Sequence, residues 1–329
     1  DACMVENTTG QYNTAVGRVA LNKNTTAIEN TAVGYAALTA NTTGANNTSM
    51  GSVTLGSNTT GSNNTAFGRN ALYANTTGAQ NTAIGCLAAD EITTGAENTA
   101  IGYRSMASTT TSNYNTAVGS DSLRTNATGT NNTAVGYSAL VLNTASYNSA
   151  FGYNALKSNS SGERNTALGR TALEANTTGN HNVGVGMAAL EVNTTGDNNT
   201  AVGYLALVAN TTASNNVAVG TSALGANTTG TRNTAVGANA LDALTTENDN
   251  TAIGYAALST EVSGFRNVAV GSSAGATQNG GTNNALFGYY AGAAITTGDA
   301  NTFIGSDCGD ATTTASSNTA VGQNAMGAN

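Results

Sequence analysis

The chain has 329 residues, a formal net charge of −8, 9% charged residues, 40 Gly, no Pro and no Trp. Its ten Lys and Arg residues are scattered singly, and no run of about 18 apolar residues exists, so neither nucleic-acid binding nor membrane insertion is expected. Asn, Thr and Ala dominate the composition, and this bias indicates sequence repetition or disorder. Val, Ile and Leu recur at fixed spacing, which favours repetition.

A 17-residue repeat runs through the whole chain and is written N-T-A-V-G-Y-x-A-L-x-x-N-T-T-G-x-N, with Asn13 at position 1. Nineteen copies follow one another with a single interval of 16 residues, between Gly136 and Gly152. Helical solenoid repeats run from about 33 residues upward, and Asn-Thr-Thr-Gly is poor helix material. The repeat therefore predicts an all-β fold, a parallel β-solenoid (β-roll) of about nineteen 17-residue coils.

In chain order, we expect one solenoid domain over residues 1–329, divided by the character of its coils. Residues 1–12 form a partial first coil, residues 13–271 form regular coils, and residues 272–329 form variant coils with Gly at position 9. The sequence starts at repeat position 6 and stops at position 12, which predicts open coil ends. Unpaired ends of this kind invite further stacking.

Within each coil, the glycine at position 5 predicts a corner with positive φ or a close approach of another backbone. Between this corner and a second one at position 15, two short extended stretches are expected, Thr-Ala-Val and the segment around Ala-Leu. The corner glycines include Gly17, Gly34, Gly51, Gly68, Gly85, Gly136 and Gly237.

Position 1 is Asn in all nineteen copies. Stacked Asn amides can hydrogen-bond along an axis, as in cross-β ladders, whereas the alternative is that Asn only tolerates a turn dihedral. The sequence predicts an Asn ladder that includes Asn13, Asn30, Asn47, Asn64, Asn81, Asn98, Asn132 and Asn233.

Position 4 is large and apolar in every copy, and we expect it to be buried as the structural core column. Its members include Val16, Val33, Phe67, Ile84, Val118, Val135, Val202, Val236, Ile253 and Val321. Position 3 is nearly always Ala, and adjacent strand residues point to opposite faces, so both faces are apolar. One face fills the coil, and the other needs a covering surface, which self-association would supply.

Three late copies exchange volume between two positions. Position 9 is mostly Leu but is Gly at Gly275, Gly292 and Gly309, and in two of these copies position 3 grows from Ala to Leu286 and Phe303. Because cores keep total volume better than residue identity, we expect positions 3 and 9 to share one space, within a coil or across an interface.

The segment Asn132-Thr133-Ala134-Val135-Gly136-Tyr137-Ser138-Ala139-Leu140 resembles the head repeats of trimeric autotransporter adhesins. The full 17-residue form, with Asn-Thr-Thr-Gly, is similar to repeats of phage-type tail-fibre proteins. The resemblance covers the whole chain and implies a parallel β-roll in a homotrimeric fibre, displayed outside the cell, on the cell surface or on a virion. The 17-residue unit is longer than the coil of the adhesins, so handedness and trimer geometry stay open.

No catalytic, cofactor-binding or metal-binding residues are predicted, and we expect no enzyme activity and no cofactor. His181 and the acidic residues Glu163, Glu174, Glu191 and Asp197 occupy variable repeat positions, as solvated residues do. A glycan-cleaving pair of carboxylates assembled across chains is the alternative. Three cysteines, Cys3, Cys86 and Cys308, have no metal-site spacing. The many Asn-x-Thr matches, such as Asn7-Thr8-Thr9, are either glycosylation sites or a consequence of the repeat.

The expected function is a structural or adhesive extracellular fibre segment, an adhesin or tail-fibre shaft that presents a recognition surface. The expected partners are further copies of the chain, in a homotrimer or a filament, and a cell-surface glycan or protein receptor. The first alternative is a subunit of an extracellular filament that stacks end to end. The second is an ice-binding solenoid, which is disfavoured because Thr at position 2 is followed two residues later by an apolar residue rather than by Thr.

Overall fold

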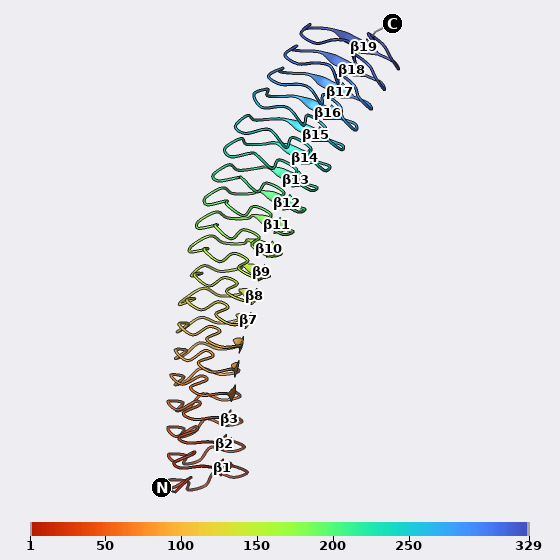
Figure 1. The fold of residues 1–329 in the computed structure, drawn as a ribbon. Helices are drawn as coiled ribbons and strands as arrows, with labels where there is room; N and C mark the ends of the chain where they lie inside the picture. Colours follow the sequence, from red (N-terminus) through yellow and green to blue (C-terminus); the bar gives the residue numbers. More distant parts are fainter. Residues whose placement is uncertain (1, 328–329) are drawn as a thin grey trace. The chain divides into compact units, whose positions relative to one another are not determined.

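The computed structural model describes residues 2–327 and is all-β: this range contains nineteen strands of three residues and no helix. Each strand belongs to one coil, and consecutive strands pair in parallel at intervals of one repeat, so the predicted parallel β-solenoid of 17-residue coils is confirmed. The chain divides into two compact units, residues 1–164 and residues 165–329. Figure 1 shows the coils of each unit stacked with their strands on one side.

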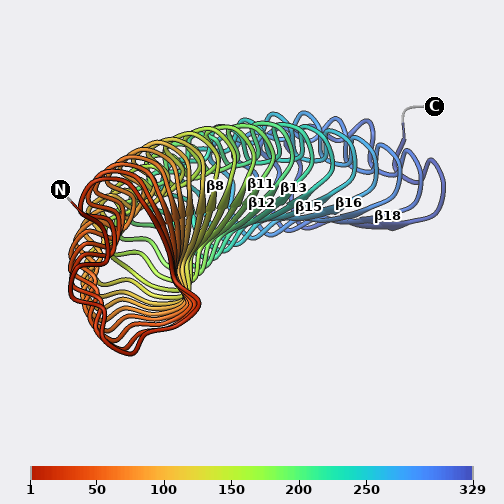
Figure 2. The same cartoon turned by 90° about the horizontal axis from the view of Figure 1, so that it is seen from below.

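In the first unit, each strand lies directly over its predecessor with like residues in register; Thr14, Ala15 and Val16 of the first strand pair with Thr31, Ala32 and Val33 of the second. Figure 2 shows these coils lying one over the other. The strands are β1 (Thr14–Val16), β2 (Thr31–Val33), β3 (Thr48–Met50), β4 (Thr65–Phe67), β5 (Thr82–Ile84), β6 (Thr99–Ile101), β7 (Thr116–Val118), β8 (Thr133–Val135) and β9 (Ser149–Phe151).

The 16-residue coil lies in this unit and does not disturb the strand register, since Val135 still pairs with Phe151. The residue at position 14 is missing from this coil, which places the deletion in the turn between Thr144 and Ala145. A turn outside the strand ladder absorbs the change because it does not set the pairing of side chains on the two faces.

The second unit repeats the same parallel, in-register pairing, for example Val202 with Val219. Its strands are β10 (Thr166–Leu168), β11 (Val183–Val185), β12 (Thr200–Val202), β13 (Val217–Val219), β14 (Thr234–Val236), β15 (Thr251–Ile253), β16 (Val268–Val270), β17 (Ala285–Phe287), β18 (Thr302–Ile304) and β19 (Thr319–Val321).

The glycine at position 5 ends every strand for two reasons. Its φ is strongly positive, for example 133° at Gly34, a region that L side chains rarely adopt. A Cβ on Gly34 would also lie 2.3 Å from the carbonyl oxygen of Gly51 in the next coil. The close approach is thus to the next coil of the same chain. The same positive φ occurs at the other predicted corners, Gly17, Gly51, Gly68, Gly85, Gly136 and Gly237.

The predicted second extended stretch, around Ala-Leu, is wrong. Positions 7 and 9 adopt left-handed backbone conformations, with φ of 52° at Ala36 and 51° at Leu38. This turn directs two consecutive side chains, Ala37 and Leu38, into the coil, and both are fully buried. A strand would have placed them on opposite faces.

The interior of the coil is formed by Ala at positions 3 and 8 and Leu at position 9, as in Ala32, Ala37 and Leu38, each with no exposed surface. The prediction that position 4 is the core column is therefore wrong: none of its members is buried in the single chain, and Val16 is 57% exposed. The physical reason is size, because the interior that already contains Leu at position 9 leaves room only for Ala opposite. The outward column includes Val16, Val33, Phe67, Ile84, Val118, Val135, Val202, Val236, Ile253 and Val321.

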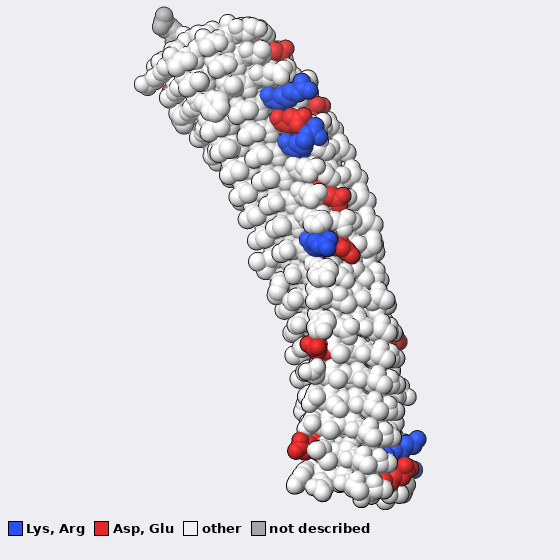
Figure 3. Space-filling view, turned by 180° about the vertical axis from the view of Figure 1, so that it is seen from behind, with Lys and Arg blue, Asp and Glu red and all other residues white. Residues whose placement is uncertain are grey.

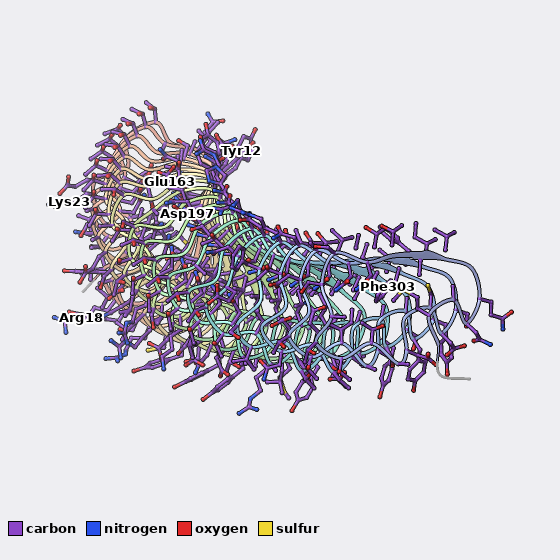
Figure 4. All side chains as sticks on the ribbon, turned by 90° about the horizontal axis from the view of Figure 1, so that it is seen from above. Tyr12, Arg18, Lys23, Glu163, Asp197 and Phe303 are labelled. Atoms are coloured by element: carbon purple, nitrogen blue, oxygen red, sulfur yellow. The ribbon has the colours of Figure 1, made fainter. Side chains whose placement is uncertain are left out.

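The variant coils near the C-terminus show that positions 3 and 9 share this interior within one coil. Phe303 and Leu286 are fully buried, and Figure 4 shows Phe303 among the coil ribbons. A Cβ on Gly309 would lie 2.2 Å from the Phe303 ring, and a Cβ on Gly292 would lie 2.7 Å from a methyl group of Leu286. The glycine at position 9 therefore provides the volume that the larger residue at position 3 occupies.

Candidate functional site

The outward side of the strands presents a continuous surface in each unit, which we call the strand face: the side chains at repeat positions 2 and 4. Thr and Val alternate with the inward Ala along each strand, because neighbouring strand residues point to opposite sides. Parallel pairing in register then arranges position 2 over position 2 and position 4 over position 4, as in Thr116 with Thr133 and Val118 with Val135. Leu168 and Phe287 on this face are 49% and 40% exposed. In the single chain, the strand face therefore presents an accessible apolar column at position 4 beside a column that is mostly Thr at position 2.

Charged side chains avoid the strand face. All 28 Lys, Arg, Asp and Glu residues of the chain lie at repeat positions 6, 7, 10, 11, 12, 15, 16 or 17, and none lies at positions 1 to 5 in any copy. Figure 3 shows charged side chains gathered at a few places on a surface that is otherwise without charge. Solvent-facing sheets normally carry charged residues that discourage association, so their absence distinguishes this face from the rest of the coil.

The position-1 asparagines lie inside the coils and form a hydrogen-bonded ladder along each unit. The backbone N–H of Asn64 donates to Oδ1 of Asn47 at 3.0 Å, and its side-chain amide donates to the same atom at 3.1 Å. The bond repeats from coil to coil. The backbone N–H donors include Asn30, Asn47, Asn64, Asn81, Asn98, Asn132 and Asn233, and Asn13 provides the first acceptor.

A second ladder at position 12 was missed by the sequence reasoning. The side-chain amide of Asn58 donates to Oδ1 of Asn41 at 2.8 Å, and Asn41 donates to Asn24 at 3.1 Å. Both ladders meet at one backbone acceptor, because Asn47 and Asn58 each donate to the Gly61 carbonyl at 2.9 Å. The sequence contains a signal for this ladder, since position 12 is Asn in most copies. However, the motif Asn-Thr-Thr-Gly is also typical of an exposed turn, and that interpretation does not predict buried Asn side chains.

Most Asn-x-Thr matches are part of the position-12 ladder. Asn24, Asn41 and Asn58 have no exposed surface, and their amide nitrogens already donate hydrogen bonds. In the folded coil these nitrogens are therefore inaccessible to a modifying enzyme. The matches at this position follow from the repeat.

The candidate acid and base residues do not converge. His181 is exposed at position 17, and Glu174, Glu191 and Asp197 are half-buried at separate places in different turns. Oδ1 of Asp197 accepts a hydrogen bond from the backbone N–H of Asn180 at 2.6 Å, which is a structural role. Glu163 is adjacent to Arg164 and pairs with it at 3.4 Å. Within residues 2–327, no group of three or more His, Cys, Asp or Glu side chains could hold a metal ion.

Two kinds of carboxylate environment occur in the turns. Burial raises the pKa of Asp90 and of Asp242, both at position 10. By contrast, the hydrogen bond from Arg232 lowers the pKa of Asp249, and the two side chains form a bidentate pair with N–O distances of 2.6 and 3.0 Å.

The cysteines are separate: Cys3 is exposed, Cys86 is half-buried, and Cys308 is buried, with its thiol donating to the Ala320 carbonyl at 3.3 Å. Burial raises the pKa of Cys308, which disfavours the reactive thiolate.

No protein-family model matches this chain, and no curated protein matches it in sequence. Across residues 2–327, no helix is long and apolar enough to cross a bilayer. The feature that stands out chemically is the strand face, which combines solvent access, an apolar column at position 4 and a complete lack of charged residues.

Proposed function

We propose that the chain is a structural, adhesive segment of an extracellular fibre, in which copies of the chain pack side by side through their strand faces. The observation that carries this proposal is the exposed, charge-free apolar column at position 4. Exposed apolar surface of this extent is typical of a binding surface rather than of a surface that stays in water.

The period of the strand face favours a second copy of the chain as the covering partner. The face repeats once per coil, at the parallel-strand spacing of about 4.8 Å. A partner that covers it along many coils must present side chains with the same spacing, and another copy of this chain does so. Closed cyclic assemblies are the common outcome when identical chains associate, and a homotrimer is the assembly that we propose.

The interior of the coils supports a mechanical role. Each coil is joined to the next by backbone hydrogen bonds, by two Asn ladders and by Thr hydroxyls, as in the 3.1 Å bond from Thr25 Oγ1 to the Thr42 carbonyl. Such a segment holds a recognition surface at a distance from its base.

The test is the mass of the purified chain in solution, by light scattering, for the wild type and for Val118→Glu/Val135→Glu. We expect the wild type to have three times the mass of one chain. Two carboxylates on the strand face would be desolvated and repelled in the assembly, so the variant should have the mass of a single chain. A wild type that remains a single chain at all concentrations would contradict the proposal.

Thr111→Glu/Thr128→Glu is the matched control, because it adds the same charge at exposed turn positions away from the strand face. It should keep the mass of the wild type. Circular dichroism of both variants distinguishes loss of assembly from loss of folding. Electron microscopy separates the trimer from the alternative filament, which would give a continuous distribution of lengths.

A further inference from the structure

A row of exposed tyrosines follows the strand face at repeat position 6 in the first unit. Tyr103, Tyr137 and Tyr153 occupy this position in three of four consecutive coils, and each is about half exposed. Small or charged residues occupy position 6 in many other coils, so the tyrosines are not required by the fold. Tyrosine is enriched where proteins bind partners, because its ring offers a rigid apolar face with a polar tip.

The Tyr137 ring is held in place from one side. Tyr153 stacks on it with ring centroids 5.5 Å apart and an interplanar angle of 12°. Because the two rings come from consecutive coils, the opposite face of Tyr137 is turned toward the preceding coil. That coil carries Ser120 at position 6, whose small side chain provides no ring to cover this face.

Hydrogen-bonding groups follow Ser120 in the preceding coil, which is held in register by the 3.0 Å bond from the Ser138 N–H to the Ser120 carbonyl. Oδ1 of Asp121 pairs with Arg124 at 3.4 Å and with Arg104 at 3.8 Å. Oδ2 of the same carboxylate accepts only a long bond of 3.4 Å, from the Ser120 hydroxyl. This oxygen therefore keeps acceptor capacity for a ligand hydroxyl, and the arginines offer donors beside it.

Charges of both signs occur in this region. Arg104 and Arg124 both pair with Asp121, and Asp90 interacts electrostatically with Glu91 and with Arg104. A mixed set of donors and acceptors beside a rigid aromatic ring suits a neutral ligand with an apolar face and several hydroxyls. A pyranose sugar has this character: polarised C–H groups on its face contact the negative face of the ring, and its hydroxyls bond to Asp121 and Arg124.

We infer that Tyr137, Ser120, Asp121 and Arg124, supported by Tyr153, form a binding site for a neutral pyranose unit of a glycan. We call this group the tyrosine patch. It lies beyond the corner glycine rather than on the strand face, and so it does not depend on self-association. In a fibre, it would be repeated on each copy of the chain, and weak single contacts would add up through multivalency.

The test is retention of the purified chain on an array of immobilised oligosaccharides that contain neutral hexoses and, separately, acidic sugars. We expect the wild type to bind at least one neutral glycan and Tyr137→Ala to weaken this binding by about tenfold, the loss of one aromatic anchor. Asp121→Asn should weaken it as well. Because the chain has no Trp, tyrosine fluorescence reports titration with the soluble sugar directly.

Tyr35→Ala is the control, since Tyr35 occupies the same repeat position with similar exposure but has no stacked tyrosine; it should bind as the wild type does. Three results would overturn the inference: the chain retains no glycan, it retains acidic glycans alone, or Tyr35→Ala and Tyr137→Ala lose glycan binding equally. Light scattering on the same samples reports assembly independently, so failure of glycan binding is distinguishable from failure of self-association.

Discussion

Phe303 fills an interior volume that Leu at position 9 fills in most other coils. It is fully buried against Gly309, so Phe303→Ala would leave a cavity that the rigid turn cannot close. We expect the free energy of unfolding to fall by about 3–5 kcal/mol. Chemical denaturation, followed by circular dichroism, measures the change.

The double variant Phe303→Ala/Gly309→Leu restores the residues of a regular coil, and we expect it to recover part of the lost stability. Gly309 has a φ of 72°, and Leu adopts similar left-handed values at this position elsewhere, so the backbone accepts the change. Phe265→Ala, at an exposed position, is the control and should change stability little. A double variant less stable than Phe303→Ala would contradict the shared-volume interpretation.

Asp90 is a second residue that affects the stability of the folded chain, through the protonation of its carboxyl group. Burial raises the pKa of Asp90 in the folded chain above the unfolded value of about 3.9. The folded state thus binds the proton more tightly, and the stability that this group contributes is present at acid pH and lost as pH rises through the folded pKa. Asp90→Asn should therefore raise the thermal midpoint at pH 7, with a smaller gain near pH 3.

Asn22 occupies the same repeat position as Asp90, which indicates that the amide fits this turn. Glu29→Gln, at an exposed position, controls for a general effect of removing negative charge. A gain for Asp90→Asn that is larger at acid pH than at neutral pH would show that desolvation is not its cause.

At the scale of single residues, the sequence predicts conformation better than orientation. The corner at position 5 could be predicted because only glycine accepts its φ and the close carbonyl of the next coil. The direction of position 4 could not, since Ala and Val are both apolar and period-two alternation does not say which face is inside. The size of the coil interior decides which strand residue points inward, and this size depends on where Leu at position 9 points.

At the scale of one coil, the Asn ladders replace much of the hydrophobic core that a narrow solenoid lacks. Asn64 accepts from the backbone of Asn81 and donates to Asn47 and to the Gly78 carbonyl. Asn64→Ala leaves these buried groups unpaired, and each unmet bond costs about 1–3 kcal/mol. We expect the free energy of unfolding to fall by at least the cost of one such bond. We also expect faster hydrogen exchange at the backbone amides of the two adjacent coils.

Asn63→Ala is the matched control for the ladder, because Asn63 is the next residue in the chain but is exposed at position 17. Equal effects of the two variants on stability and exchange would show that the ladder does not hold the coils together.

The turn over positions 6 to 11 is the element that the sequence predicts least well. Left-handed Leu is uncommon because Cβ crowds the following carbonyl, so a sequence pattern favours an extended segment there. In the structure, backbone hydrogen bonds between coils compensate, such as the 3.0 Å bond from the Leu38 N–H to the Thr54 carbonyl. Tertiary contacts therefore override local propensity at this turn.

At the scale of each whole unit, one coil is the repeating element of the structure. Thr31 pairs with Thr48 and Thr48 with Thr65, so removing residues 47–63 lets the coil of Asn64 take the place of the missing one. We expect this deletion variant to keep the circular dichroism spectrum and a single unfolding transition. The interface energy of a solenoid is a sum over neighbours, so the thermal midpoint should fall only slightly.

Removal of residues 47–55 alone is the contrasting variant. It joins two partial coils and destroys the register of strands, ladders and corners together, so we expect unfolding or aggregation. If both deletions unfold the chain, the coils are not interchangeable neighbours.

The in-register repeat also has a genetic consequence. Tandem repeats in a gene are prone to replication slippage, and a slip by one 17-residue repeat would add or remove one whole coil in frame. Because each coil brings its own corner glycine, ladder amides and inward alanines, the altered protein would need no compensating substitution. The number of coils could therefore change by whole units while the cross-section of each coil stayed the same.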